Sequence, residues 1–250
     1  MMASGSRSGC DERSAGRLGV MHRFFVDPAA MVGERFPIPA SISHQVMRVL
    51  RLRDGDEITL LDGIGGEVRC RLQVTDCVVQ TRGLAGGEPR HQLTVWQALL
   101  RGDHLEPVMR HGTELGIARF GLFVSERCVA RELTPRRLTR LRAVAREAAE
   151  QSERGIVPPV DAPVSYADAL AAAAPGSVLL FERHHGKRLT ETEAPPSVFI
   201  GPEGGFSPAE VEAAERAGLA IAGLGPRILR SETVALAVAA AILSRTGDFA

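Results

Sequence analysis

The chain lacks several features that would assign it to a class at once. No uninterrupted apolar run approaches the roughly 18 residues that a membrane-spanning helix needs. The longest candidate, Val234 to Leu243, has ten residues and is rich in alanine. Neither sign of charge is in excess, with 30 basic and 30 acidic side chains in 250 residues, and only 4% of the residues are aromatic. These numbers predict a soluble globular chain of one or two domains without a global positive field.

Cysteine and histidine are also sparse and poorly placed for metal binding. The four cysteines, Cys10, Cys70, Cys77 and Cys128, have the spacing of neither a zinc knuckle nor a CxxC redox pair. His184 and His185 are adjacent, and adjacent residues rarely ligate one ion. We therefore expect reduced thiols, no metal site and a cytoplasmic protein. The first twenty residues lack the apolar centre of a secretory signal, so we expect a disordered extension over 1–20.

Short β-type runs alternate with glycine and aspartate turns between Met21 and about Arg90. In EVRCRLQV (67–74) polar and apolar residues alternate, which is typical of a strand with one face on a core and one in water. We expect a small antiparallel barrel over 21–90, with strands at 57–61, 67–74 and 77–82. Its arginines Arg48, Arg51 and Arg53 crowd into one segment and could form a local positive patch.

The pattern changes after the linker-like stretch LAGGEPRHQ (84–92). Continuous apolar runs at 93–100 and 120–125 are typical of strands covered on both faces. Further strands are expected at 178–181, 198–200 and 221–224, and helices near 135–153, 165–174, 208–217 and 231–245. Because strands and helices alternate, residues 91–250 are predicted to form an α/β domain with a mostly parallel sheet.

The first candidate site is the segment VFIGPEGGFSPAEVEAAERAG (198–218), an apolar strand followed by a glycine-rich loop and a helix. Ser207 is placed as N-cap, and Glu210 three residues later completes a capping box. The glycines let backbone groups approach a ligand closely, and open α/β sheets bind ligands at the carboxyl ends of their strands. An ordinary turn between strand and helix is the alternative.

The second candidate, IAGLGPRILRSETVALAVAAAIL (221–243), repeats this layout. Arg230, Glu232 and Thr233 directly precede an almost entirely apolar helix, which must be buried in the core or against another subunit. Charged groups at the start of such a helix need partners, so they are better site candidates than charges on a solvated face. The two loops together could form the walls of one pocket.

An arginine-rich helix adds a possible nucleic-acid surface. Residues 131–154 carry seven arginines against four glutamates. This excess could meet RNA phosphates, and a solvated face with Arg/Glu pairs is an equally good explanation.

The residues also resemble a known family, the RsmE 16S rRNA (uracil-N3)-methyltransferases of the SPOUT superfamily. The likeness extends from about Met21 to the C-terminus, and IGPEGGFS (200–207) and LGPRILRSETVAL (224–236) are its most specific motifs. It also includes HRFFV (22–26), LLRGDHLE (99–106), SERC (125–128) and EQS (150–152). The resemblance implies a PUA-like RNA-binding β-barrel, a trefoil-knotted α/β methyltransferase domain and a homodimer. The chain departs from the common pattern at His111, Leu141, Glu153 and Ser231.

For the cofactor, the resemblance implies S-adenosyl-L-methionine and a set of residues that bind it. These are Leu180, Phe181, Ile200, Gly201, Glu203, Gly205, Leu224, Gly225, Ile228, Leu229, Arg230 and Thr233. The apolar members suit an adenine ring, and the glycines give it access to the backbone.

For the reaction, the resemblance implies methylation of N3 of a uridine in 16S rRNA, on the small ribosomal subunit. We hypothesise that Arg230 stabilises charge on a uracil carbonyl oxygen, and that Glu203 or Glu232 assists deprotonation or orients Arg230. RNA contacts are expected from Arg23, Arg48, Arg51, Arg53, Arg127 and Arg154. The alternatives are an enzyme of the same superfamily acting on tRNA or 23S rRNA, and a noncatalytic RNA-binding ribosome assembly factor.

Overall fold

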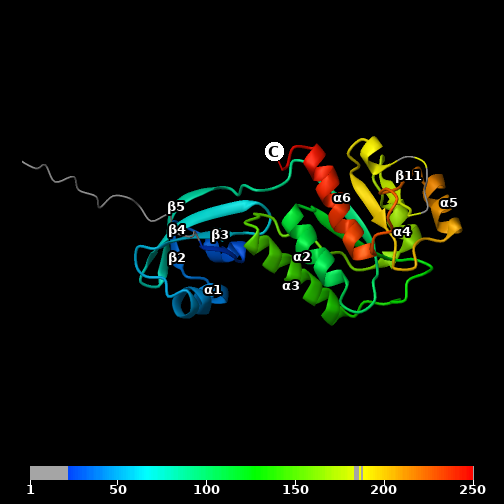
Figure 1. The fold of residues 1–250 in the computed structure, drawn as a ribbon. Coiled ribbons are helices and arrows are strands. Elements are labelled where there is room, and N and C mark those ends of the chain that lie inside the picture. The colour runs from blue at the N-terminus through cyan, green and yellow to red at the C-terminus, as the bar shows by residue number, and fades with distance from the viewer. Residues whose placement is uncertain (1–21, 183–185, 187, 250) are drawn as a thin grey trace, which may run out of the picture.

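The computed structural model describes residues 22–182, 186 and 188–249. The expected extension over 1–20 lies outside the described residues, as do Cys10, His184 and His185. The chain forms two lobes: a smaller one made of the elements up to β5 and a larger one made of the elements from β6 onward (Figure 1).

The smaller lobe is built on a five-stranded sheet with the strand order β1-β3-β4-β5-β2. Its strands are β1 (His22–Phe25), β2 (Arg35–Pro37), β3 (Glu57–Leu61), β4 (Gly66–Gln73) and β5 (Asp76–Leu84). The expected period of two is confirmed in β4, where Val68, Cys70 and Leu72 are buried and the intervening Arg69 and Arg71 are exposed. The buried side chains pack with Phe24, Phe36 and Leu60 into the core of this lobe.

The expectation of an antiparallel sheet is wrong for one strand. β1 pairs parallel with β3, whereas the other three pairs are antiparallel. Parallel neighbours need a crossover connection rather than a tight turn. The chain between β1 and β3 supplies it with β2 and three short helical segments: η1 (Pro28–Met31), α1 (Ala40–His44) and η2 (Gln45–Val49).

The larger lobe contains a six-stranded sheet in which every pair is parallel, with the order β11-β9-β10-β6-β7-β8. Its strands are β6 (Thr94–Ala98), β7 (Arg119–Val124), β8 (Val164–Ser165), β9 (Val178–Leu180), β10 (Ser197–Ile200) and β11 (Ala220–Ala222). Both faces are covered, because the strands consist of almost continuous buried apolar residues. The predicted α/β class with a parallel sheet is therefore confirmed.

The helices of this lobe follow the strands in chain order. They are α2 (Leu105–Leu115), α3 (Pro135–Gln151), α4 (Tyr166–Ala171), η3 (Leu189–Glu191), α5 (Pro208–Arg216) and α6 (Ser231–Arg245). α2 packs against both α3 and α6, α4 packs on β7, and α5 packs on β11 (Figure 1). None of the helices in the described part of the chain combines the length and hydrophobicity that crossing a bilayer requires.

The last helix, α6, follows β11 in the sequence but begins on the opposite side of β9 from β11. β11 is an edge strand, yet the first residue of α6 contacts the ends of β10 and β6. Between β11 and α6, the Gly223 carbonyl accepts a hydrogen bond from the Leu189 N–H. Near the C-terminal end of α6, Arg245 donates a hydrogen bond to the Leu189 carbonyl. The trefoil knot that the resemblance implies would involve this crossing of the β9–β10 connection.

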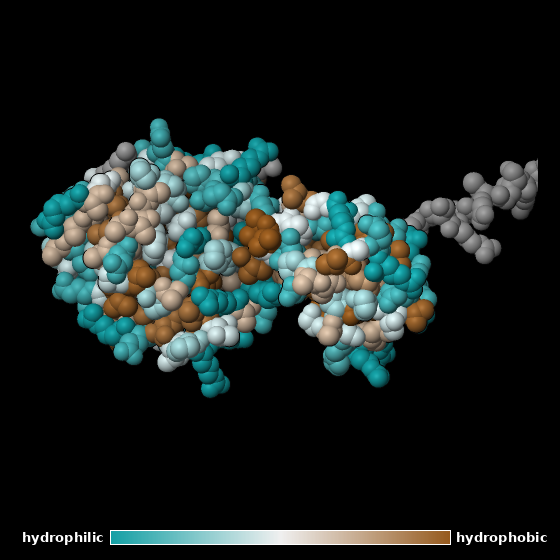
Figure 2. All heavy atoms as spheres, turned by 180° about the vertical axis from the view of Figure 1, so that it is seen from behind, coloured by the Kyte–Doolittle hydropathy of each residue, from teal (hydrophilic) through white to brown (hydrophobic). Residues whose placement is uncertain are grey.

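A small apolar cluster joins the two lobes. Phe25 and Leu61 of the smaller lobe pack against Ala149 of α3. The guanidinium of Arg146 lies over the Phe25 ring, 5.3 Å from its centroid, and donates a hydrogen bond to the Phe25 carbonyl. The view from behind shows the narrower waist at this junction and a mixed hydrophilic and hydrophobic surface on both lobes (Figure 2).

Candidate functional site

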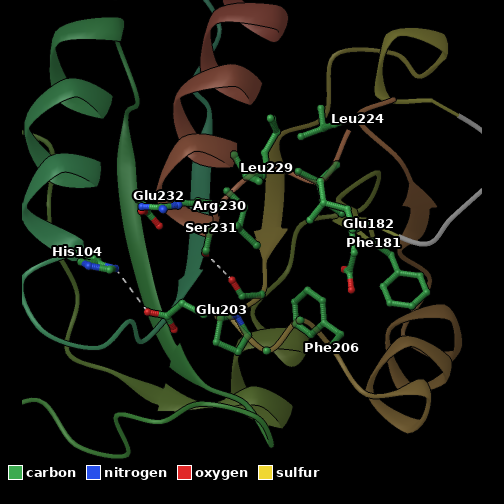
Figure 3. Close-up of a pocket in the computed structure, with 18 of the residues that line it drawn as sticks. His104, Phe181, Glu182, Glu203, Phe206, Leu224, Leu229, Arg230, Ser231 and Glu232 are labelled. Atoms are coloured by element: carbon green, nitrogen blue, oxygen red, sulfur yellow. Dashed lines mark hydrogen bonds and ion pairs between the residues drawn. The ribbon is translucent and has the colours of Figure 1, made fainter. Parts of the chain in front are cut away.

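A cavity of about 550 Å³ opens at the carboxyl ends of β9, β10 and β11. Its walls are two segments, which we call the first glycine loop (residues 201–207) and the second glycine loop (residues 224–230). The first loop follows β10 and the second follows β11. Because these two parallel strands flank β9, both loops lie at the carboxyl end of the sheet (Figure 3). The size is within the range of small-molecule and cofactor sites.

The first glycine loop is fixed by the start of α5. The Ser207 hydroxyl accepts a hydrogen bond from the Glu210 N–H, and the Glu210 carboxylate accepts one from the Ser207 N–H at 2.9 Å. The predicted capping box is therefore confirmed. Gly205 has a φ of +67°, and a Cβ there would lie 2.7 Å from Oε1 of Glu182. Glycine at this position removes both the backbone strain and the clash.

Neighbouring segments hold the first glycine loop from outside. The other carboxylate oxygen of Glu210 accepts a hydrogen bond from the Glu126 N–H at 2.8 Å. Arg127 donates to the Gly204 carbonyl at 3.2 Å. The segment after β7, which contains SERC (125–128), is thus tied to the loop after β10.

Buried aromatic rings pack between the first glycine loop and the sheet. Phe206 is buried and stacks on Phe123 of β7, with the ring centroids 6.2 Å apart. Tyr166 packs against both rings and donates a hydrogen bond to the Glu210 carbonyl at 2.9 Å. Burial raises the pKa of the Tyr166 phenol, and the nearby Glu210 raises it further, so Tyr166 stays a neutral donor.

The second glycine loop has much less support. Gly225, Arg227, Ile228 and Arg230 are exposed, and Ile228 retains 76% of its accessible surface. None of the backbone N–H groups from Leu224 to Leu229 donates a hydrogen bond within the described residues. These donors and the apolar side chains beside them are available to a ligand.

One buried hydroxyl connects the two loops. Ser231, the first residue of α6, donates to the Gly201 carbonyl at 2.5 Å and accepts a hydrogen bond from the Gln97 side chain at 2.9 Å. Gln97 is completely buried in β6. The sequence interpretation missed it, although a glutamine inside the apolar run LTVWQALL was a usable signal, because a buried amide needs a partner.

Polar side chains gather at one end of the cavity. Glu203 accepts a hydrogen bond from the Arg101 backbone N–H at 3.1 Å, and its Oε1 atom lies 3.6 Å from Nδ1 of His104 (Figure 3). Arg230 and Glu232 line the same cavity, and Oε2 of Glu232 is buried without a hydrogen-bond partner among the described residues. The arrangement places the carboxylates of Glu203 and Glu232 and the guanidinium of Arg230 at the same cavity.

The structure brings together most of the residues predicted for the site. The three predicted catalytic residues, Arg230, Glu203 and Glu232, all line the cavity. Of the predicted cofactor residues, Thr233 alone does not line it and is exposed. The members that line it are Leu180, Phe181, Ile200, Gly201, Glu203, Gly205, Leu224, Gly225, Ile228, Leu229 and Arg230.

Among the lining residues that were not predicted, Arg101, His104 and Glu182 are the ionisable ones outside the two glycine loops. Arg101 and His104 follow the strand β6, and Glu182 follows β9. Polar residues directly after a buried strand are the signal that could have identified them, because the carboxyl ends of parallel strands share one edge of the sheet.

The arginines predicted to contact RNA fall into two groups. Arg48, Arg51, Arg53 and Arg127 are exposed. Arg154 is 3% exposed, pairs with Glu88 at 2.7 Å and donates to two carbonyls of the α2 end, and Arg23 is partly buried and lies 3.2 Å from Glu67. In this conformation Arg154 has no surface to offer RNA, and its contacts instead tie the linker to the α/β lobe.

No group of three or more histidine, cysteine or acidic side chains that could hold a metal ion occurs in residues 22–182, 186 and 188–249. The described cysteines, Cys70, Cys77 and Cys128, are free and buried.

Comparisons with known proteins agree with this geometry. The family model described as "RNA methyltransferase domain" matches residues 87–243, and the model described as "RNA methyltransferase PUA domain" matches residues 43–76. Ribosomal RNA small subunit methyltransferase E of Synechocystis is 32% identical, over 93% of this chain and 81% of the relative. The protein of the same name from Bacillus subtilis is 29% identical, over 90% of this chain and 97% of the relative.

A solved structure extends the likeness to three dimensions. Ribosomal RNA small subunit methyltransferase E from Neisseria gonorrhoeae, bound to S-adenosyl methionine, superposes with a TM-score of 0.80 and 31% identity. The alignment covers 90% of this chain and 98% of that one.

Proposed function

Since the chain belongs to the family of ribosomal RNA small subunit methyltransferase E, we propose that it transfers a methyl group from S-adenosylmethionine to N3 of a specific uridine in 16S rRNA. The observation that carries this proposal is the cavity between the two glycine loops, with Arg230, Glu203 and Glu232 on its wall. The names of the curated relatives support 16S rRNA over tRNA or 23S rRNA as the substrate, and support an enzyme over a noncatalytic assembly factor.

The residues of the cavity fit the cofactor that the Neisseria relative binds. Leu180, Leu224 and Leu229 offer apolar contacts to an adenine ring, and the second glycine loop offers backbone N–H groups that have no acceptor among the described residues. Gly205 keeps the floor between the loops open beside Glu182. We assign cofactor binding to the eleven predicted residues that line the cavity, and we retain Thr233 as a proposal. When bound, S-adenosylmethionine supplies an activated methyl group.

The chemistry left to the protein is alignment and charge stabilisation. Uridine N3 must point at the methyl carbon, so most of the rate acceleration comes from the orientation of the two reactants. N3 must also lose its proton, which leaves negative charge on the uracil carbonyl oxygens. Of the three arginines that line the cavity, we assign Arg230 to stabilising this charge, and Glu203 and Glu232 are the candidate bases.

For the RNA surface, we propose the exposed arginines on both lobes. Arg48, Arg51 and Arg53 lie together in the smaller lobe, and Arg127 lies beside the first glycine loop. Their charge is local, so the zero net charge of the chain does not oppose RNA binding. We propose that residues 21–90 hold the RNA and residues 91–250 carry out the reaction.

We also propose that the protein works as a homodimer in the cytoplasm. The apolar helix α6 buries one face against the core but leaves a second apolar stripe only partly covered, made of Val234, Leu236, Ala237, Ala240 and Ala241. Ile228 extends this surface into the second glycine loop. A partner copy on this stripe would cover it and would lie next to Arg230.

The test is methylation of purified small subunits from a strain that lacks the enzyme. The protein is incubated with these subunits and labelled S-adenosylmethionine, and the modified nucleoside is identified by mass spectrometry. We expect label on N3 of a single 16S uridine. Label only in tRNA or 23S rRNA would overturn the substrate, and failure to bind S-adenosylmethionine in calorimetry would overturn the enzyme assignment.

A further inference from the structure

Glu203 and His104 form a pair whose geometry suits proton transfer, and this inference rests on the proposed function. We propose that Glu203 is the group that accepts the N3 proton of uridine, and that His104 is a positioning residue that takes this proton from Glu203 and releases it to water. The pair thereby resolves which of the two candidate bases, Glu203 or Glu232, accepts the proton.

The first observation is the orientation of His104. Its Nδ1 atom is buried, has no hydrogen-bond partner among the described residues, and lies 3.6 Å from Oε1 of Glu203. The rest of the side chain is 39% exposed. The imidazole therefore faces the carboxylate with one nitrogen and reaches solvent with the remainder of the ring, which is the placement that a proton carrier needs.

The second observation concerns how Glu203 is held. The Arg101 backbone N–H donates to the same Oε1 atom at 3.1 Å, so the carboxylate has a fixed direction, and the Arg101 Nε atom lies 4.0 Å away. The Glu203 side chain is 25% exposed and lines the cavity. It has a donor on one side, a cleft on the other and His104 behind it (Figure 3).

Glu232 lacks such an outlet. Its Oε2 atom is buried without a hydrogen-bond partner among the described residues, so no neighbouring group there is placed to take a proton from it. A proton accepted by Glu232 would have to return through the cavity. Arg101, Glu182, Arg227, Arg230 and Glu232 are the other charged groups that line the cavity around the pair.

The proton balance of this route is complete. Uridine N3 gives its proton to the Glu203 carboxylate, and its electron pair forms the bond to the methyl carbon, while the carbon–sulfur pair stays on the departing sulfur. The protonated Glu203 then gives the proton to neutral His104, and the imidazolium releases it to water. No oxidant, reductant or metal ion is needed.

The experiment compares kcat, KM and pH profiles of the full-length protein on small subunits that lack the modification. His104→Gln keeps a hydrogen-bonding side chain but cannot titrate. We expect its kcat to fall by about 10- to 100-fold with little change in KM or in S-adenosylmethionine affinity. We expect an acidic limb in the wild-type pH profile to which the imidazole contributes, and this contribution should disappear in His104→Gln while that of the Glu203 carboxyl remains.

Two further variants keep the result interpretable. His104→Ala should regain activity when imidazole is added, because free imidazole can replace the missing proton acceptor. His111→Gln changes an exposed histidine on α2 that pairs with Glu114 at 3.0 Å outside the cavity, and it should keep wild-type kinetics and the acidic limb.

Three outcomes would overturn the route. These are a wild-type kcat and pH profile in His104→Gln, an unchanged acidic limb accompanied by weaker cofactor binding, and no response of His104→Ala to imidazole. In each of them the wild type still methylates N3, so the proposed function stands. A wild type that leaves the subunits unmethylated would overturn the proposed function and the route with it.

Discussion

The two glycine loops have similar sequences around a Gly-Pro pair, yet the structure holds them very differently. The first glycine loop has a capping box at its end, the Arg127 side chain on Gly204 and the buried Phe206 beneath it. The second is exposed over most of its length and is anchored at Ser231. The difference indicates that the first loop is a preformed wall, whereas the second leaves its backbone N–H groups open to a ligand among the described residues.

If the second glycine loop carries the chemistry, Arg230→Ala should have the largest effect. We expect kcat to fall by about 10²- to 10³-fold because the charge on the uracil oxygen loses its partner, while S-adenosylmethionine still binds. Steady-state methylation and calorimetry measure the two quantities. Arg216→Ala, which removes an exposed arginine on α5, is the control. Wild-type turnover in Arg230→Ala would remove this residue from the mechanism.

If the first glycine loop is preformed, it should tolerate substitution less well than the second. Gly204→Ala adds a Cβ 3.1 Å from the Cβ and 3.3 Å from the carbonyl oxygen of Arg127, and should lower the free energy of unfolding by about 1–3 kcal/mol and weaken cofactor binding. Ile228→Ala truncates a side chain of the second glycine loop that is 76% exposed, and should leave the free energy of unfolding nearly unchanged. Urea unfolding should show the smaller loss for Ile228→Ala, and equal losses would contradict the comparison.

The Ser231 hydroxyl should couple the two loops. Ser231→Ala leaves the Gln97 amide and the Gly201 carbonyl without their shared partner, which costs about 1–2 kcal/mol of stability. Ser231→Thr keeps the hydroxyl and should retain most of the wild-type stability. Denaturation curves and cofactor titrations of both variants test this. Identical behaviour of alanine and threonine would show that the hydroxyl does not connect the loops.

The smallest expected effect concerns the cap of the first glycine loop. Ser207→Ala removes the N-cap of α5 and should reduce stability by about 1 kcal/mol, with a modest loss of cofactor affinity. Thr134→Ala removes the N-cap of α3, which does not contact the first glycine loop, and should cost similar stability without affecting affinity. An unchanged affinity in Ser207→Ala would mean that the loop keeps its shape without the cap.

Much of the fold was predictable because its signals are local. The apolar run at 198–200, the capping box at Ser207 and Glu210, and the alternation in 67–74 specify their elements without reference to distant residues. The parallel pairing of β1 was not predictable in this way, since it depends on a crossover of more than thirty residues between His22–Phe25 and Glu57–Leu61.

The site was predictable to a similar degree and for a similar reason. Glycines and charged residues that directly follow a predicted strand indicate a loop at the carboxyl end of the sheet. The resemblance to the family then identified the binding residues in both loops. The burial of Arg154 depends on its contact with Glu88, which lies 66 positions away in the sequence. The bridging position of Gln97 depends on its contact with Ser231, which lies 134 positions away. Such contacts leave no periodic trace in the sequence.

By itself the sequence determined the elements, the two glycine loops and the family, because helix caps, strand periods and motif spacing act over a few residues. Only the tertiary structure decided which side chains share the cavity. It placed His104 behind Glu203, separated the exposed arginines from the buried Arg154, and joined the loops through Ser231. These relations depend on how strands β6, β9, β10 and β11 order themselves in one sheet, and strand order is a property of the whole folded chain.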